Sequence, residues 1–155
     1  MSEEKIGELK FIASMFRMAI EEFNNVMGPE TIQTIFRLIG ENQGKEVAKR
    51  MREKFNLENW TSSDFAEKFP KDVLDPVLGE GNTIVNVEGN KISLVLKECP
   101  FQRAGIDISN QFYCTYTTGL IETTAHELLG DVEFATQKLR AKDGVDCTFT
   151  LEIKN

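Results

Sequence analysis

The apolar pattern of the first 27 residues most limits how this chain can fold. Within residues 3–27, apolar side chains recur at alternating spacings of three and four, as one face of an α-helix requires. The main stripe consists of Ile6, Leu9, Ala13, Phe16, Ile20, Phe23 and Met27, and a second stripe beside it of Ile12, Met15, Ala19 and Val26. A helix with two adjoining apolar faces has two alternatives: one wide face in its own core, or a seam against a second copy of the chain.

A second predicted helix carries two glycines that need an explanation. The pair Gly28-Pro29 ends the first helix and begins the second, which is expected to run from about residue 30 to 55. Gly40 and Gly44 lie four residues apart, on one face of this helix, although each glycine costs about 1 kcal/mol relative to alanine. Either the close approach of another helix or a bound ligand would offset that cost.

Beyond about residue 80 the apolar period changes from that of helices to that of strands. A short third helix, which Pro70 is expected to end, precedes the change. The predicted strands are 83–87, 91–97, 132–140 and 145–153. Turns at 88–90 and 142–144 join them into two hairpins, and a helix over 112–129, ended by Gly130, lies between the hairpins.

These elements predict an α+β fold. Their order is ααα-ββ-α-ββ, with N-terminal helices packed on a four-stranded antiparallel sheet. We expect residues 1–155 to form a single domain, because no linker is long enough to divide them. Its helical part is expected to span residues 1–79, and the sheet with its helix residues 80–155.

The composition excludes some classes of partner. The formal net charge is −7 and the basic residues are dispersed, so we expect no direct binding of nucleic acid, which depends on Lys and Arg neutralising phosphates. No apolar run reaches the roughly 18 residues of a membrane span, and the start of the chain lacks the pattern of a signal peptide. The expected location is therefore the cytoplasm, without membrane association.

All three cysteines fall near the ends of predicted elements. Cys99 follows the second strand, Cys114 lies in the first turn of the last long helix, and Cys147 begins the last strand. Loops can bring such positions together, so the three cysteines could form one metal or ligand site. The alternative is that they are three separate thiols in the apolar core. The helix N-terminus favours the thiolate form of Cys114, whereas Cys147 shares the parity of Phe149 and Leu151 and is expected to point into the apolar face.

Other chemistry-bearing residues add little to this site. The single histidine, His126, lies too far along the helix of Cys114 to share an ion with it. A fourth ligand would come from Asp146, Asp143, Glu98, a water molecule or an exogenous group. The motifs G-x-S-x-G, G-x-G-x-x-G and the phosphate loop do not occur, so we find no hydrolytic machinery.

Several motifs of the second half resemble a known family in their order and spacing. They are Cys-Pro-Phe from Cys99, Cys-Thr-Tyr-Thr-Thr-Gly from Cys114, Glu-Leu-Leu-Gly ending at Gly130, and Asp-Gly-Val-Asp-Cys-Thr-Phe around Cys147. Together they resemble the vinyl-4-reductase-type small-molecule-binding domain of archaeal hydrocarbon-binding proteins. That superfamily resembles the TRAPP transport-particle subunits in fold, the ligand-binding type found in NO signalling and Golgi transport. The version that opens on Cys-Pro-Phe looks closest to the methanogen output domain. Its relatives occur in iron–sulfur-sensing repressors and in 2-aminothiazoline-carboxylate hydrolases.

The resemblance covers about residues 80–153 and implies a metal or a cluster at the cysteines. In aromatic-sensing relatives, zinc is held by cysteines and a glutamate, and Cys114 and Cys147 match two of those cysteines. Gln137 and Arg140 stand where the glutamate and the other cysteine would be, so that four-ligand set is incomplete. In the iron–sulfur repressors, Cys99, Cys114 and Cys147 each match a cysteine of the resembling sequence. Zinc, or an iron–sulfur cluster with one foreign ligand, is the cofactor that the resemblance implies.

The resemblance also implies a pocket for a small apolar molecule. We expect this pocket between the second helix, the segment around Phe101 and the last long helix, lined by Phe36, Phe101 and Tyr116. Gly40 and Gly44 would form its low wall.

We therefore expect a sensing or binding module for a small molecule or a metal, and not an enzyme. It is expected to form a homodimer through the helix of residues 3–27. The alternatives are an iron–sulfur-binding regulatory domain, a small hydrolase like the thiazoline relatives, and a structural interaction domain with buried thiols.

Overall fold

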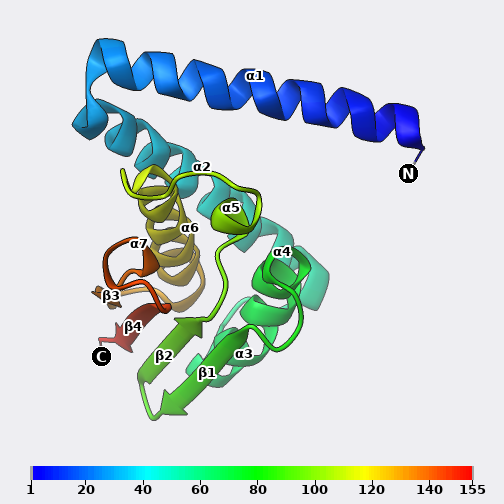
Figure 1. The fold of residues 1–155 in the computed structure, drawn as a ribbon. Helices are drawn as coiled ribbons and strands as arrows, with labels where there is room; N and C mark the ends of the chain where they lie inside the picture. The colour runs from blue at the N-terminus through cyan, green and yellow to red at the C-terminus, as the bar shows by residue number, and fades with distance from the viewer. Residues whose placement is uncertain (1, 155) are drawn as a thin grey trace.

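The fold has the α+β architecture that the sequence predicts, with a four-stranded antiparallel sheet of order β1-β2-β4-β3 (Figure 1). The computed structural model describes residues 2–154, and only the backbone of Asp143. The elements are α1 (Glu3–Met27), α2 (Pro29–Phe55), α3 (Ser62–Phe69), a π-helix (Pro70–Leu74), α4 (Asp75–Leu78), β1 (Thr83–Glu88), β2 (Lys91–Leu96), α5 (Pro100–Arg103), α6 (Phe112–Leu129), β3 (Val132–Lys138), α7 (Arg140–Asp143) and β4 (Cys147–Ile153). None of the helices in the described part is long and apolar enough to cross a membrane.

The pairing of β2 with β4 builds the centre of the sheet. Ile92, Leu94 and Leu96 alternate with less buried residues along β2, so the predicted apolar face is confirmed. They join Phe149 and Leu151 of β4 in the main core. Alternation with a period of two places such side chains on the same face of a sheet.

Two connections differ from the prediction. Helix α3 ends at Phe69, directly before Pro70, as predicted, but the helical segment continues as a π-helix and α4, and burial of Pro70, Leu74 and Leu78 holds this continuation on the core. Proline lies at the first position of the π-helix, where its missing N–H is tolerated. The second predicted hairpin is also interrupted, because the short helix α7 replaces the tight turn and ends at Gly144, whose φ of 76° is left-handed.

The packing of α2 on α6 explains the two glycines of the second helix. A Cβ at Gly40 would collide with the carbonyl oxygen of Tyr116, and a Cβ at Gly44 would lie 2.8 Å from the Cβ of Thr123. From the other side, a Cβ on Gly119 of α6 would lie 2.7 Å from a backbone oxygen of α2. Close approach of the two helices accounts for Gly40 and Gly44, whereas their expected place in a pocket wall stays a prediction.

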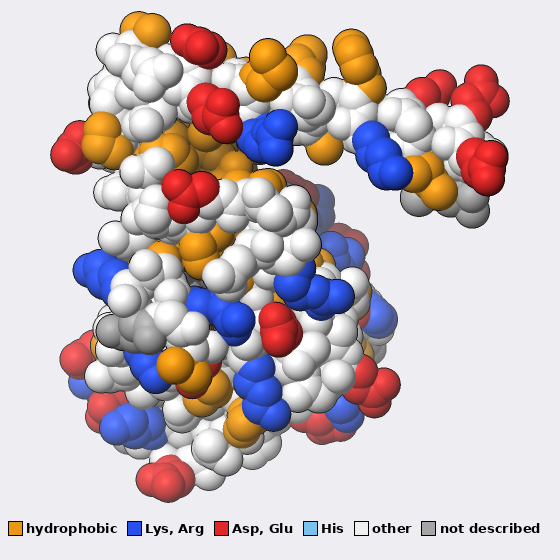
Figure 2. All heavy atoms as spheres, in the orientation of Figure 1, with side chains coloured by type: hydrophobic (Ala, Val, Ile, Leu, Met, Phe, Trp, Pro, Cys, Tyr) orange, Lys and Arg blue, Asp and Glu red, His pale blue; other side chains and the backbone are white. Residues whose placement is uncertain are grey.

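The N-terminal half of helix α1 extends away from the rest of the chain, whereas its C-terminal half contacts the smaller apolar cluster through Ile20. None of its residues, all of which the structure describes, is buried. Figure 2 shows apolar side chains along its outer side, over much of its length. Those of its large apolar residues that remain exposed are Ile6, Leu9, Phe11, Ile12, Met15, Phe16, Met18, Phe23, Val26 and Met27. The alternative of one wide core face is therefore wrong, because the domain does not fold back over this helix.

We expect Gly40→Ala and Gly44→Ala to lower the free energy of unfolding by about 1–3 kcal/mol each, the usual cost of overpacking. Urea denaturation followed by circular dichroism measures it. Gly7→Ala is the matched control, since a Cβ at this helical glycine meets no other atom within 4 Å and alanine favours the helix. Equal stability of all three variants would contradict the proposed role of the glycines in packing.

Candidate functional site

The three cysteines come from elements far apart in the sequence and line one small cavity. Leu96 of β2 pairs with Cys147 of β4, so the end of β2, from which the chain continues to Cys99, lies beside the start of β4. The first turn of α6 brings Cys114 to the same place. The cavity measures about 30 Å³ and is lined by Leu96, Cys99, Pro100, Phe101, Tyr113, Cys114, Thr117, Leu139, Cys147 and Phe149. The three cysteines, which were expected to converge because they lie at the ends of elements, therefore line one shared cavity.

Aromatic rings form one side of this site. The Phe101 ring stacks on that of Tyr113, with centroids 4.1 Å apart, and meets Tyr116 edge-on at 6.4 Å. On its other side, Tyr113 packs against Phe36 at 5.1 Å, and Phe36 stacks with Phe112. Phe36, Phe101 and Tyr116 thus belong to one group of packed rings where α2, α5 and α6 meet. Of the three, Phe101 lines the cavity, and a pocket lined by all of them stays a prediction.

Burial keeps two of the thiols protonated. Desolvation raises the pKa of Cys114 to about 12, and the neighbouring Cys147 and Cys99 add to the rise because they would repel a thiolate. The effect of the helix N-terminus, which favours the thiolate of Cys114, is therefore outweighed by burial. Desolvation also raises the pKa of Cys147. The backbone N–H of Arg140 donates to the Sγ atom of Cys147 at 3.3 Å and lowers this pKa, but by less.

Arg140 joins the segments that carry the cysteines. Its Nε donates to Gln102 Oε1 at 2.7 Å, and its Nη1 donates to the carbonyl oxygens of Val145, at 2.9 Å, and Lys97. These partners belong to α5, to the residues just before β4, and to the residues just after β2. The side chain of Arg140 thus cross-links the site with hydrogen bonds.

The structure describes no complete set of metal ligands. Among the side chains that it describes, no group of three or more His, Cys, Asp or Glu residues is arranged to hold an ion. Asp146 forms an ion pair with Lys138 at 3.5 Å and accepts a hydrogen bond from Thr148, and the side chain of Asp143 lies outside the described residues. His126 lies elsewhere, with Nδ1 3.2 Å from the carbonyl oxygen of Gly130. A metal at Cys99, Cys114 and Cys147 stays a prediction.

Part of the cavity lining carries no strong signal in the sequence. Tyr113 and Thr117 were not predicted as lining residues. A helical spacing could have indicated them, because Thr117 lies four residues beyond Tyr113 and three beyond Cys114, and such spacings put side chains on one helix face. Leu139 had no such signal, because it precedes a helix that the sequence did not predict.

Comparisons with known proteins define the class of fold. No family model and no curated protein matches the sequence. The chain is similar to the structure of trafficking protein particle complex subunit 3 from Naegleria fowleri covalently bound to palmitic acid, with 18% identity, 97% of each chain covered and a TM-score of 0.67. It is also similar to the phenol-responsive sensory domain of the transcription activator PoxR with phenol, with 13% identity, 90% of this chain and 73% of that one covered, and a TM-score of 0.56. The fold is thus similar to that of a TRAPP subunit, as expected. The vinyl-4-reductase and methanogen output resemblances stay predictions.

We expect Cys114 to react with iodoacetamide at pH 8 at least about tenfold more slowly in the folded protein than in urea, because only the thiolate attacks and the pKa of this thiol is raised to about 12. Quenched time points analysed by peptide mass spectrometry measure the rate. Equal rates in the folded and unfolded protein would show that the site is open and the thiol unperturbed.

Proposed function

We propose that this protein is a non-catalytic module that binds a small apolar molecule in the thiol-lined cavity. The observation that supports it is the enclosure of one apolar cavity by β2, α5, α6 and β4, with aromatic rings along one side. Apolar concave sites with few polar groups are typical of ligand pockets. The two similar structures hold palmitic acid and phenol, and an alkyl chain or an aromatic ring suits such walls.

The cavity must enlarge before such a ligand enters. A volume of about 30 Å³ holds little more than one water molecule, whereas an apolar cavity that binds benzene measures about 150 Å³. The wall best able to move is α5, a four-residue helix without buried residues. Its Phe101 is only partly buried, so a ring of similar size can replace it against Tyr113.

A metal at the cysteines is the second candidate. Cys99, Cys114 and Cys147 line one cavity, which is the observation in its favour, and zinc or an iron–sulfur cluster is the cofactor to test. Elemental analysis and a visible spectrum of protein purified without oxygen distinguish zinc, a coloured cluster and free thiols. The hydrolase alternative and the cytoplasmic location stay predictions.

We also propose that α1 pairs with α1 of a second copy. The helix has 25 residues, about 37 Å at 1.5 Å per residue, and its apolar side chains are left exposed by its own domain. Burial of apolar surface contributes about 25 cal/mol per Å², so leaving several of these side chains in water forgoes several kcal/mol. An isologous dimer covers the same stripe on both subunits at once.

We expect phenol to raise the melting temperature of the protein and Phe101→Ala to bind it more tightly, because loss of this ring enlarges the cavity. Differential scanning fluorimetry and isothermal titration calorimetry measure the two effects. Phe11→Ala removes the same ring from exposed α1 and serves as the control. No phenol binding to either the wild type or Phe101→Ala would refute an apolar ligand site here.

We expect light scattering at micromolar concentration to give twice the chain mass of 17.6 kDa, and Phe16→Glu to give a folded monomer. Phe16 lies in the main apolar stripe of α1 and is 47% exposed in the single chain, so the added charge opposes pairing without entering the core. Asn25→Glu adds the same charge at an exposed polar position of α1 and should remain a dimer. A wild-type mass of 17.6 kDa would overturn the pairing of α1.

A further inference from the structure

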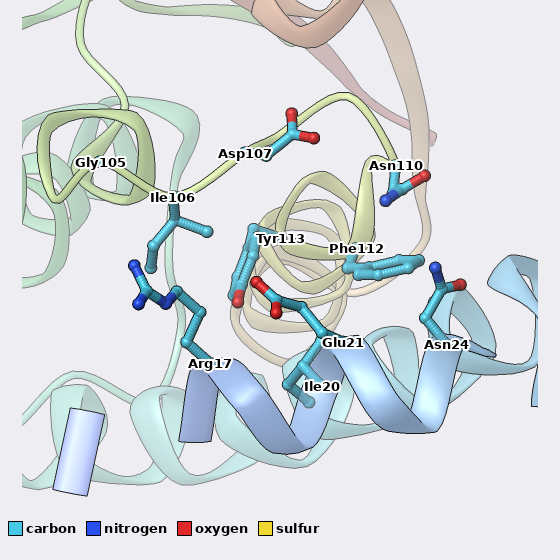
Figure 3. A pocket seen from close by; sticks show the side chains of 10 residues that line it. All are labelled: Arg17, Ile20, Glu21, Asn24, Gly105, Ile106, Asp107, Asn110, Phe112 and Tyr113. Carbon is cyan, nitrogen blue, oxygen red and sulfur yellow. The ribbon is translucent and has the colours of Figure 1, made fainter. Parts of the chain in front are cut away.

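A second and larger cavity lies between α1 and the loop that leads into α6. It measures about 220 Å³ and is lined by Arg17, Ile20, Glu21, Asn24, Gly105, Ile106, Asp107, Asn110, Phe112 and Tyr113 (Figure 3). Tyr113 is the one residue that also lines the thiol cavity, so its ring separates the two sites. This second cavity is below the range of about 300–1,000 Å³ that is usual for drug-sized ligands, and its occupant is accordingly small.

Two opposite charges on α1 face this cavity without pairing. Arg17 and Glu21 are four residues apart, a spacing at which ion pairs often form on a helix. Within the part of the chain that the structure describes, neither takes part in an ion pair or a side-chain hydrogen bond. Figure 3 shows the guanidinium pointing toward Ile106 and the carboxylate toward Tyr113. The charge of Glu21 is close enough to Tyr113 to add to the rise of its pKa, whose main cause is burial.

A further acceptor on the same side of α1 lacks a partner. The Oδ1 atom of Asn24 is buried, and no donor among the described residues bonds to it. Leaving a buried acceptor unsatisfied costs about 1–3 kcal/mol. Asn24 lies three residues beyond Glu21, so the two side chains share one helix face. The carboxylate of Asp107, by contrast, already accepts from the backbone N–H and the hydroxyl of Ser109, each at 2.9 Å.

These groups are complementary to a molecule with one positive and one negative charge. The carboxylate of Glu21 can accept hydrogen bonds from an ammonium group, and the nearby rings of Phe112 and Tyr113 favour a cation. Arg17 can donate to a carboxylate at the other end. The remaining walls, such as Ile20, are apolar. We propose that this cavity binds an amino acid, with its ammonium group at Glu21 and its carboxylate at Arg17.

Isothermal titration calorimetry with defined probes tests this proposal. The probes are L-leucine, its two single-charge counterparts 3-methylbutylamine and 4-methylpentanoate, and 5-aminopentanoate, whose charges lie further apart. We expect one of the two amino acids to bind, and the single-charge counterparts to bind at least tenfold more weakly. Preference for L-leucine or for 5-aminopentanoate then tells whether the ligand is an α-amino acid or a longer amino carboxylate. No binding of either amino acid, or equal binding of a single-charge counterpart, overturns the proposal.

Variants of α1 locate the binding. Arg17→Gln and Glu21→Gln should each weaken binding of the amino acid at least tenfold, and both side chains are exposed, so the fold should persist. Glu22→Gln is the control, because this residue lines the outer groove of α1 with Phe11 and Met15 and not the cavity. Unchanged affinity in Glu21→Gln would overturn the proposal. Phenol binding at the thiol cavity should be the same in all three variants, so this proposal and the proposed function can fail independently.

Discussion

The contact of α2 with α6 is the constraint on which the rest of the structure depends. Three glycines, Gly40 and Gly44 on α2 and Gly119 on α6, let the two backbones approach so closely that no side chain fits between them. Thr124 of α6 donates to the carbonyl oxygen of Gly44 at 3.3 Å within this contact, and Arg37 of α2 forms an ion pair with Glu122 of α6 at its edge. Because Cys114 lies in the first turn of α6, the same contact determines where this thiol meets the sheet.

The thiol cavity shows which of two opposing electrostatic effects is larger. A helix N-terminus contributes about 0.3–1 kcal/mol in favour of a negative charge, which lowers a pKa by less than about one unit. Burial among apolar side chains and two further sulfurs raises the pKa of Cys114 to about 12, a larger effect in the opposite direction. The position in the helix therefore does not activate this thiol, and the site is suited to an apolar occupant more than to nucleophilic chemistry.

Two features of this chain lie outside its apolar core: the hydrogen bonds of Arg140 and the exposed helix α1. The guanidinium of Arg140 bonds to segments that follow β2 and precede β4, which stabilises an arrangement that short loops alone would leave loose. Helix α1 leaves its apolar stripes exposed, while its C-terminal half contributes Ile20 to a small aromatic cluster with Phe36, Phe112 and Tyr113. Ile20 belongs to the main stripe and also lines the proposed amino acid site, so the proposed dimer would use the part of the stripe that remains exposed, such as Leu9 and Phe16.

The sequence by itself determined the elements that repeat with a clear period. The apolar period of 3.6 predicted α1 and α2, and the period of two predicted the strands and the buried face of β2 around Leu94, because each pattern reports which side chains share one side of an element. The ends of elements also indicated that the three cysteines converge.

Only the tertiary structure decided what covers each face and how the site is charged. Whether α1 joins its own core, and whether Gly40 faces a ligand or a helix, depends on a partner far away in the sequence. The protonation of Cys114 and the bonds of Arg140 likewise depend on residues that approach from other elements. Local periodicity records which side chains share a face, whereas the burial, charge and close packing of that face depend on which distant atoms approach it.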